Sequence, residues 1–587
     1  MSTTGTTEHI FNGIGVSPGV AHGKILVYRT AEEVVPEYDV PAAQVPQEVA
    51  RFEASLIKTR EQLHRLQERI ATGVGSTAPS SILDVHLSIT EDPALIEPVM
   101  SRLEKEHKNV EHILHDVIHK YMQTLQDLPD DYLRERAADV QDVGHRIVRN
   151  LLGREHIGLA NVPPGTIVIA YDLSPSDTSS LNRQNVVGFA TDVGSHTSHT
   201  AIVARSLNLP AVVGLRDVSQ HVCDGQTALL DGYSGTLIIN PSERTLAVYG
   251  QIEQKRHTVE ERLASLRALP AETVDGHRVT LAGNIELPSD VPALLQAGAE
   301  GIGLFRTEFL YLNRKDYPSE QEQYEKYIEV VRAVKPHPVI IRTLDIGGDK
   351  FREEDGVQED NPFLGFRAIR FCLANPDIFT AQLRAILRAS TEGDVKIMYP
   401  MISGINEVIR ANEILEQVKA DLRAESKPFN ENIPVGAMIE IPSAALTAEM
   451  IAKEVDFFSI GSNDLIQYTM AVDRVNERVA NLYEPTHPAI LRLLRNIVES
   501  AHNNNIWVGL CGEMAGDPLF APLLIGMGID ELSVGASSLP RVKEVIRRIK
   551  LRDAQNLAAE TLHVTRGSEV QNMLKSLLHD IDPDLIP

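Results

Sequence analysis

The spacing of apolar residues changes twice in the first half of this chain and predicts two kinds of structure there. Residues 15–19 form a glycine-rich turn before an apolar run at 24–28, which is the pattern of a turn followed by a strand. From about residue 41 to 153 the chain is charged, poor in glycine and heptad-like, which predicts a bundle of four or five helices. Strand-like sequence resumes at 166–170, so we expect the bundle to be inserted into an α/β domain.

The second half of the chain repeats a strand-then-helix pattern. Eight short apolar runs, separated by helical sequence, begin near Val279, Ile302, Val339, Val395, Val435, Phe457, Trp507 and Glu531. Eight β/α units within about 300 residues are typical of a (β/α)8 TIM barrel. Residues 242–269 have a helical pattern without a strand, which predicts a helix that connects the two halves.

These patterns predict an α/β multidomain protein. We expect an α/β domain at 1–40 and 154–241, an inserted helical bundle at 41–153, a helical linker at 242–270 and a C-terminal TIM barrel at 271–587. A chain of 587 residues is long enough for several domains, each with its own core.

The composition restricts the kinds of partner that the protein can bind and the cellular compartment in which we expect it. Lys and Arg total 56 against 81 Asp and Glu, and the net charge of -25 argues against a general affinity for nucleic acid or anionic membranes. The three cysteines are widely separated and show no CxxC spacing, which argues against disulfides and a structural zinc site. We find no leader-like apolar segment at the start and no run long enough to span a bilayer, so we expect a cytoplasmic protein without membrane insertion.

Reactive side chains follow the predicted barrel strands at their carboxyl ends. They are Arg306 after the second strand, Arg342 and Asp345 after the third, Glu440 after the fifth, Asn463 and Asp464 after the sixth, and Cys511 and Glu513 after the seventh. Because this end of a TIM barrel is its active-site face, we expect these residues to converge there.

The residue types indicate the chemistry of this rim. Glu440 and Asp464 are hard oxygen ligands of the kind that Mg²⁺ needs. The rim also has four planar cationic groups, which suit a small substrate with carboxylate and phosphate groups. They belong to Arg306, Arg342, Arg367 and Arg474. Ordinary ion pairs with rim acids are the alternative for each arginine. Cys511 is either a buried small apolar side chain or a thiol that donates a proton to an enolate.

Residues 194–205, GSHTSHTAIVAR, place histidine among small hydroxylated side chains at a predicted helix start. The hydroxyls beside His199 would fix its tautomer, and the free amides of the helix, with Arg205 nearby, would favour an anion on it. A histidine that accepts a phosphoryl group needs this environment. A surface turn in which Ser and Thr cap the helix is the other interpretation of this segment.

Long motifs in both halves resemble the Enzyme I family of the bacterial phosphotransferase system. They are GIGVSPG near the N-terminus, TSHTAIVARSLNLPAVVG around His199, and the barrel strings GIGLFRTEFL, RTLDIGGDK, NPFLGFRAIR, DFFSIGSNDLIQYTMAVDR and GLCGEMAGD. The resemblance runs from residue 13 to about 548. It implies a swivelling phosphohistidine α/β domain with an inserted bundle that docks the carrier protein HPr, and a barrel that binds phosphoenolpyruvate.

The same resemblance implies a role for each candidate residue. His199 would take the phosphoryl group from phosphoenolpyruvate and pass it to HPr, with Thr178 as its hydrogen-bond partner, and Cys511 would protonate the enolate to give pyruvate. The substrate-binding residues would be Arg306, Arg342, Asn463, Asp464 and Arg474, with Arg205 and Arg367 in support and Glu440 and Asp464 as Mg²⁺ ligands. This reaction begins sugar uptake, and family members form homodimers through the barrel.

One position departs from the family pattern. His196 stands where the family usually has arginine, so a fixed cation is lost and a rival acceptor is created. Register with the motif and the flanking hydroxyls favour His199 as the acceptor.

Two alternative functions remain at this point. A pyruvate phosphate dikinase or phosphoenolpyruvate synthase shares the histidine domain and barrel, but it needs a nucleotide-binding domain that no segment resembles. The other alternative is a catalytically silent regulator that binds partners through the bundle and senses phosphoenolpyruvate through the barrel.

Overall fold

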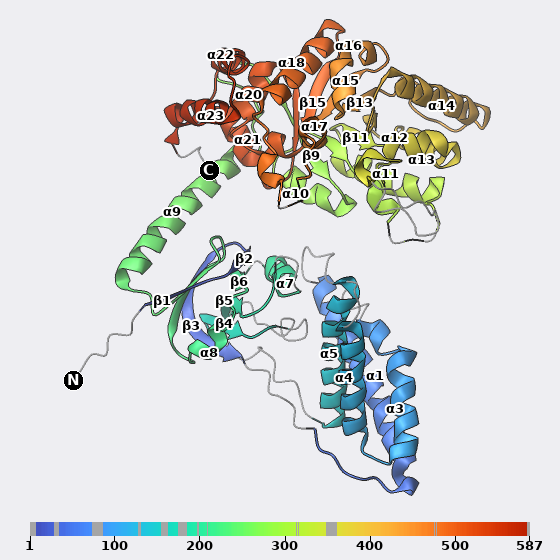
Figure 1. The fold of residues 1–587 in the computed structure, drawn as a ribbon, viewed down its shortest axis with the longest axis vertical. Coiled ribbons are helices and arrows are strands. Elements are labelled where there is room, and N and C mark those ends of the chain that lie inside the picture. The colour runs from blue at the N-terminus through green and yellow to red at the C-terminus, as the bar shows by residue number, and fades with distance from the viewer. Residues whose placement is uncertain are drawn as a thin grey trace. The chain divides into compact units, whose positions relative to one another are not determined.

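The chain divides into two units between residues 256 and 257. The computed structural model describes residues 8–28, 35–72, 86–126, 131–153, 162–173, 185–195, 199–207, 209–312, 314, 316–347, 361–474, 476 and 478–583. Figure 1 shows the elements of both units. No helix among the described residues is long and apolar enough to cross a membrane.

The N-terminal unit contains an eight-stranded mixed sheet with the order β1-β8-β7-β3-β4-β5-β6-β2. Its strands are β1 (His9–Asn12), β2 (Ile14–Ser17), β3 (Val20–Tyr28), β4 (Thr166–Ala170), β5 (Val186–Thr191), β6 (Ala211–Val213), β7 (Thr227–Asp231) and β8 (Thr236–Ile239). Parallel pairing joins β3, β4, β5 and β6, and the other pairs are antiparallel. Both faces are covered, because Ile167 belongs to one apolar cluster and Val168 to another.

Four helices are described between β3 and β4, and they lie side by side (Figure 1). They are α1 (Val45–Thr72), α3 (Pro93–Glu106), α4 (Val110–Gln126) and α5 (Asp131–Leu151). Their shared core includes Phe52, Leu95, Val99, Ile113 and Ile147. Asp92 caps α3, since its carboxylate accepts a hydrogen bond from the amide of Ala94 at 2.8 Å.

Among the described residues, three further helices precede the barrel: α7 (His199–Leu207), α8 (Val218–His221) and α9 (Glu243–Leu266). The helix predicted over 242–269 corresponds to α9. Arg262, near the C-terminal end of α9, forms an ion pair of 2.7 Å with Glu544, so this end of the helix is fixed to the barrel unit.

The C-terminal unit is a closed barrel of eight parallel strands, which confirms the predicted TIM-like fold. Its strands are β9 (Thr280–Ile285), β10 (Ile302–Phe305), β11 (Val339–Arg342), β12 (Val395–Tyr399), β13 (Val435–Ile439), β14 (Phe457–Gly461), β15 (Trp507–Cys511) and β16 (Glu531–Val534). Each begins within one residue of its predicted start. The pattern was readable because the buried strands are short, nearly continuous apolar runs.

Helices surround this barrel (Figure 1). They are α10 (Val291–Gln296), α11 (Glu320–Val334), α12 (Ala368–Ala374), α13 (Pro376–Ala389), α14 (Ile405–Ala424), α15 (Pro442–Leu446), α16 (Ala448–Ile451), α17 (Ser462–Met470), α18 (Pro488–Asn503), α19 (Glu513–Gly516), α20 (Ala521–Met527), α21 (Leu539–Ile546), α22 (Leu551–Thr561) and α23 (Gly567–Ile581). One large apolar core packs the helices onto the strands. A second, small cluster belongs to the strands alone and contains Leu304, Ile340, Met398, Met438, Phe457 and Cys511.

Candidate active site

The predicted reactive residues lie at the carboxyl ends of five barrel strands. Arg306 follows β10, Arg342 ends β11, Glu440 follows β13, Asn463 and Asp464 open α17 directly after β14, and Cys511 ends β15. Burial raises the pKa of both Glu440 and Cys511, and the nearby charge of Arg342 opposes that increase in both. The barrel therefore brings together residues that are far apart in the sequence, as predicted.

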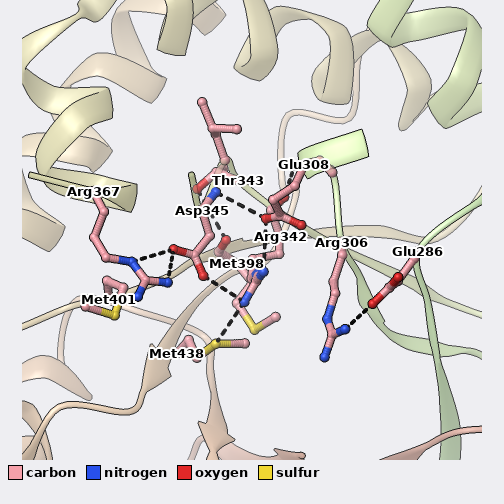
Figure 2. A network of polar contacts seen from close by, with 12 residues as sticks. Glu286, Arg306, Glu308, Arg342, Thr343, Asp345, Arg367, Met398, Met401 and Met438 are labelled. Atoms are coloured by element: carbon pink, nitrogen blue, oxygen red, sulfur yellow. Dashed lines mark hydrogen bonds and ion pairs between the residues drawn. The ribbon is translucent and has the colours of Figure 1, made fainter. Parts of the chain in front are cut away.

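Arg342 is the centre of a buried ionic network (Figure 2). Its Nη2 donates to Glu308 Oε1 at 2.9 Å, and its Nη1 lies 3.1 Å from Asp345 Oδ2. Burial lowers the pKa of Arg342, but the charges of Glu308 and Asp345 raise it overall, so the guanidinium stays charged. A largely buried, fixed cation is thereby held at the rim.

Arg367 joins this network from the start of α12. Its Nη2 and Nε lie 2.8 and 3.2 Å from Asp345 Oδ1, so one carboxylate holds two arginines (Figure 2). Burial lowers the pKa of Arg367, but the charge and hydrogen bond of Asp345 raise it, and the net change in the pKa of Arg367 is an increase. The two planar groups are thus held in a fixed relation, which suits recognition of a phosphate or carboxylate.

The two outer arginines are more exposed and each has an acidic partner. Arg306 pairs with Glu286, which follows β9 (Figure 2). Arg474 Nη1 lies 2.9 Å from Glu513 Oε1. The same Oε1 accepts from Asn463 Nδ2 at 3.3 Å, and the amide of Glu513 donates to Asn463 Oδ1 at 3.0 Å. Exposed pairs of this kind contribute little to stability, so an anionic ligand can exchange with the acids.

Glu440 and Asp464 form a carboxylate pair at the rim. Burial raises the pKa of Glu440 well above its usual value, and the charge of Asp464 adds to this effect. The amide of Met401 donates to Glu440 Oε1 at 2.6 Å. A Cβ on Gly461 would lie 2.4 Å from Glu440 Oε2, so only glycine leaves room for this carboxylate.

This pair fits a magnesium ion. Two carboxylates that repel each other are stabilised by a divalent cation between them, and Mg²⁺ usually takes one or two protein carboxylates together with water and substrate oxygens. No group of three or more His, Cys, Asp and Glu side chains able to hold a metal occurs in the described part of the chain. A site made by Glu440 and Asp464 would therefore leave coordination positions open for a substrate.

Cys511 is buried and keeps its proton. Burial raises the pKa of its thiol to about 11, although a hydrogen bond from Ser459 works in the opposite direction. The hydroxyl of Ser459 donates to Sγ at 3.4 Å, and Sγ donates to the carbonyl of Ile460 at 3.7 Å. The residue is part of the apolar interior of the barrel, yet it can also serve as a neutral proton donor.

The N-terminal unit places His199 as the first residue of α7. The side chain of His199, and all of Thr178 and His196, lie outside the described residues. Thr200 fixes the helix start, because its hydroxyl lies 3.2 Å from both Asp172 Oδ1 and the carbonyl of Leu173. Arg205, further along the same motif, donates a hydrogen bond from Nε to the carbonyl of Ala201, one helical turn earlier, at 3.2 Å.

Sequence reasoning named two acidic partners of the rim arginines, Asp345 and Glu513, and missed two others. Glu286 and Glu308 were not singled out, although each follows a barrel strand at the same rim as the arginine it binds. Ser459 was also missed, because a small hydroxylated residue in an apolar run has no distinctive pattern. Thr200 was expected as one of the hydroxyls beside His199, and the structure adds that its hydroxyl lies against Asp172 and Leu173.

Models of three domains of phosphoenolpyruvate-utilising enzymes match this chain. The N-terminal domain matches residues 12–136, the mobile domain matches 162–235, and the phosphoenolpyruvate-binding domain matches 260–551. The barrel rim described above lies in the last of these. The fold and the site therefore define the class of phosphoenolpyruvate-utilising enzymes.

Curated relatives narrow this class. Proteins named phosphoenolpyruvate-protein phosphotransferase are 43% identical in Priestia megaterium, over 97% of this chain and 99% of the relative, and 44% identical in Geobacillus stearothermophilus, over 97% and 98%. The protein of that name from Haemophilus influenzae is 42% identical over 97% of this chain and 99% of its own. The chain belongs to the phosphoenolpyruvate-protein phosphotransferase family, which confirms the resemblance found in its motifs. A solution structure of an Enzyme I protein is 37% identical, covers 42% of this chain and 99% of its own, and has a TM-score of 0.36.

Proposed function

We propose that this protein transfers the phosphoryl group of phosphoenolpyruvate to His199 and then to the carrier protein HPr, and releases pyruvate. This reaction is the first step of the sugar phosphotransferase system. The observation that carries the proposal is the convergence of a buried, charged Arg342 with the Glu440–Asp464 pair and a neutral Cys511 at one barrel rim. These are the groups needed to bind a phosphorylated carboxylic acid, neutralise charge during transfer and protonate an enolate.

The arginines bind and align phosphoenolpyruvate. Arg342 and Arg367 are held rigidly by Asp345 and offer planar donors to the phosphate or carboxylate. Arg306 and Arg474 lie in exposed pairs, so they can turn from their acidic partners to the substrate. Asn463 and Asp464 complete the substrate contacts. Alignment of this kind supplies much of the catalysis of phosphoryl transfer, since the transition state is loose.

Glu440 and Asp464 would hold Mg²⁺, which when bound supplies positive charge to the phosphate and the leaving oxygen. The neutral imidazole of His199 attacks phosphorus in line with that oxygen. Thr178 keeps the imidazole in the reactive tautomer, and the free amides at the start of α7, with Arg205, favour the resulting phosphoimidazole.

Cys511 completes the first half-reaction. Its thiol, neutral because burial raises its pKa to about 11, gives a proton to the C3 carbon of the enolate. The product is pyruvate in its keto form, which is a poor phosphoryl acceptor. Protonation therefore drives the phosphoryl group onto the protein.

Family membership also supports a proposal for the remaining partners. We assign the inserted bundle, residues 41–153, to HPr docking and the barrel to homodimerisation, and we place the activity in the cytoplasm. His199 has to meet phosphoenolpyruvate at the barrel rim and HPr at the bundle, so the α/β domain must move between them. Relatives named phosphoenolpyruvate-protein phosphotransferase match over 97% of this chain, which favours this activity over that of a dikinase.

Incubation with labelled phosphoenolpyruvate and Mg²⁺, followed by peptide mapping, tests this function. We expect an acid-labile, base-stable phosphate on His199 that is lost on addition of HPr. His199→Ala should abolish the label and His196→Ala should keep it. Label that survives in His199→Ala and disappears in His196→Ala would move the acceptor to His196, and the absence of any label would favour the regulator alternative.

A further inference from the structure

One polar side chain inside the barrel has no role in the function proposed above. Ser459 lies in the middle of β14, is 3% exposed, and donates its hydroxyl to Cys511 Sγ at 3.4 Å. The thiol itself belongs to an apolar cluster that includes Leu304, Met398 and Met438. A buried hydroxyl costs free energy unless a good acceptor binds it, and sulfur is a weak acceptor. Packing alone therefore does not explain a serine at this position.

The strand register directs this hydroxyl to the thiol. Ser459 pairs with Gly509, and Gly461 pairs with Cys511. Alternate residues of a strand share a face, so Ser459 and Cys511 are diagonal neighbours on the same face of β14 and β15. The direct cross-strand partners of the two residues, Gly509 and Gly461, are glycines, so no side chain of either partner stands between the hydroxyl and the sulfur.

The thiol is held by two hydrogen bonds of opposite sense. Sγ accepts from Ser459 and donates to the carbonyl of Ile460 at 3.7 Å. These two bonds define the orientation of the sulfur lone pairs and of its proton. Burial raises the pKa of Cys511 to about 11, and the bond from Ser459 opposes this because a donated hydrogen bond stabilises a thiolate.

We propose that Ser459 is a positioning residue for proton transfer from Cys511 to the enolate, an inference that rests on the proposed function. In this step the S–H bond breaks and a C3–H bond forms from the electron pair of the enolate double bond. The enolate oxygen becomes the keto oxygen of pyruvate, and the negative charge passes to sulfur. The Ser459 hydroxyl keeps its bond to sulfur and stabilises the thiolate until solvent returns a proton.

A second serine beside the thiol provides a matched control. Ser533 on β16 pairs directly with Cys511 and is 1% exposed. Its hydroxyl, however, donates to Asn284 Oδ1 at 2.7 Å. Two buried serines therefore flank the same cysteine from neighbouring strands, and only Ser459 is bonded to its sulfur.

The experiment uses the full chain and separates proton transfer from phosphoryl transfer. Proton transfer is measured by NMR, as the rate at which the methyl protons of pyruvate exchange for deuterium in D2O with Mg²⁺ present. Phosphoryl transfer is measured separately, as the labelled phosphohistidine formed in a single turnover. We expect Ser459→Ala to slow methyl exchange by about tenfold or more and to change the KM for phosphoenolpyruvate less than about twofold. Its melting temperature should not fall, because an apolar side chain suits this interior.

Conservative variants complete the test. Ser459→Thr keeps the hydroxyl and should retain most of the exchange rate, whereas Ser459→Val, of nearly the same shape, should behave like Ser459→Ala. Ser533→Ala should exchange at the wild-type rate. Equal exchange in the wild type, Ser459→Ala and Ser459→Val would overturn the proposal, as would equal losses in Ser459→Thr and Ser459→Val. A wild-type protein that forms no phosphohistidine would instead overturn the proposed function.

Discussion

Glu308 Oε1 lies 2.9 Å from Arg342 Nη2, and this contact gives the most buried arginine of the rim one of its two carboxylate partners. The side chains of the two residues are only 13% and 11% exposed. By contrast, the neighbouring pair of Arg306 and Glu286 is 39% and 67% exposed. The rim therefore combines a rigid inner pair with a solvated outer pair, and the two should respond differently to mutation.

Neutralising Glu308 is expected to destabilise the barrel. In Glu308→Gln, Arg342 keeps Asp345 but loses one charge partner, which should cost about 2 kcal/mol because a buried cation is left partly uncompensated. The matched change at the outer pair, Glu286→Gln, should cost less than about 1 kcal/mol. Thermal unfolding of the two variants measures the difference. Equal stability losses would show that the buried pair is no more important than the exposed one.

Glu440→Gln should separate folding from metal use. The amide can still accept the hydrogen bond from the amide of Met401, and it removes a carboxylate whose pKa is raised well above normal by burial. We therefore expect the variant to be at least as stable as the wild type. Its Mg²⁺-dependent phosphohistidine formation should fall by about 100-fold or more, because the cation would lose one of the two charged ligands proposed for it. Formation at the wild-type rate and the same Mg²⁺ concentration would rule out Glu440 as a ligand.

A pH-dependent stability is expected from Glu531, at the start of β16. Burial raises the pKa of this carboxyl from 4.5 to about 7 in the folded protein, with Lys396 opposing the increase. The folded state then binds the proton more tightly than the unfolded state, so stability should fall as the pH rises from about 5 through 7, by up to about 3 kcal/mol.

Glu531→Gln tests this effect, since an amide does not titrate. Unfolding of the variant, followed between pH 5 and 8, should lack most of the wild-type decrease, and the variant should be the more stable protein at pH 8. An exposed control, Glu413→Gln, should keep the wild-type profile. A decrease that persists in Glu531→Gln would have to originate from another group.

The barrel and its rim could be predicted because their signals are local in sequence. A strand such as β14 is a continuous apolar run, and a reactive residue such as Asp464 follows the run directly. The pairings made by Glu286 and Glu308 could not be predicted in this way, since Glu286 is 20 positions from Arg306 and Glu308 is 34 positions from Arg342. Their pairing depends on which strands are adjacent in the closed barrel, and that is a property of the whole fold.

The same distinction explains why Ser459 was missed and Cys511 was found. A cysteine at a strand end is distinctive in the sequence, whereas a serine within DFFSIG is an ordinary small residue. The relation of Ser459 to the thiol becomes apparent only from the strand register, which places the two side chains diagonally across from each other. Sequence patterns thus propose candidate reacting groups, and the structure is needed to find the side chains that contact them.

His196 should make phosphoryl transfer depend on pH in an unusual way. A free imidazole has a pKa of about 6.5, so a histidine at position 196, unlike the arginine usual in the family, can provide a positive charge only under mildly acidic conditions. At lower pH the attacking imidazole itself is lost to protonation, which confines any gain to a narrow range. In His196→Arg the cation is permanent, and the rate of phosphohistidine formation between pH 7 and 8.5 should rise above that of the wild type.

The comparison with His196→Ala isolates the effect of charge. This variant carries no cation at any pH, so it should match the wild type at pH 8.5 and fall below it near pH 6.5, whereas His196→Arg should exceed both at high pH. Single-turnover rates measured across this range distinguish the three proteins. Parallel profiles for all three would mean that the charge at position 196 does not act on the transition state. The amides at the start of α7 would then stabilise the transferred phosphoryl group without a neighbouring cation at that position.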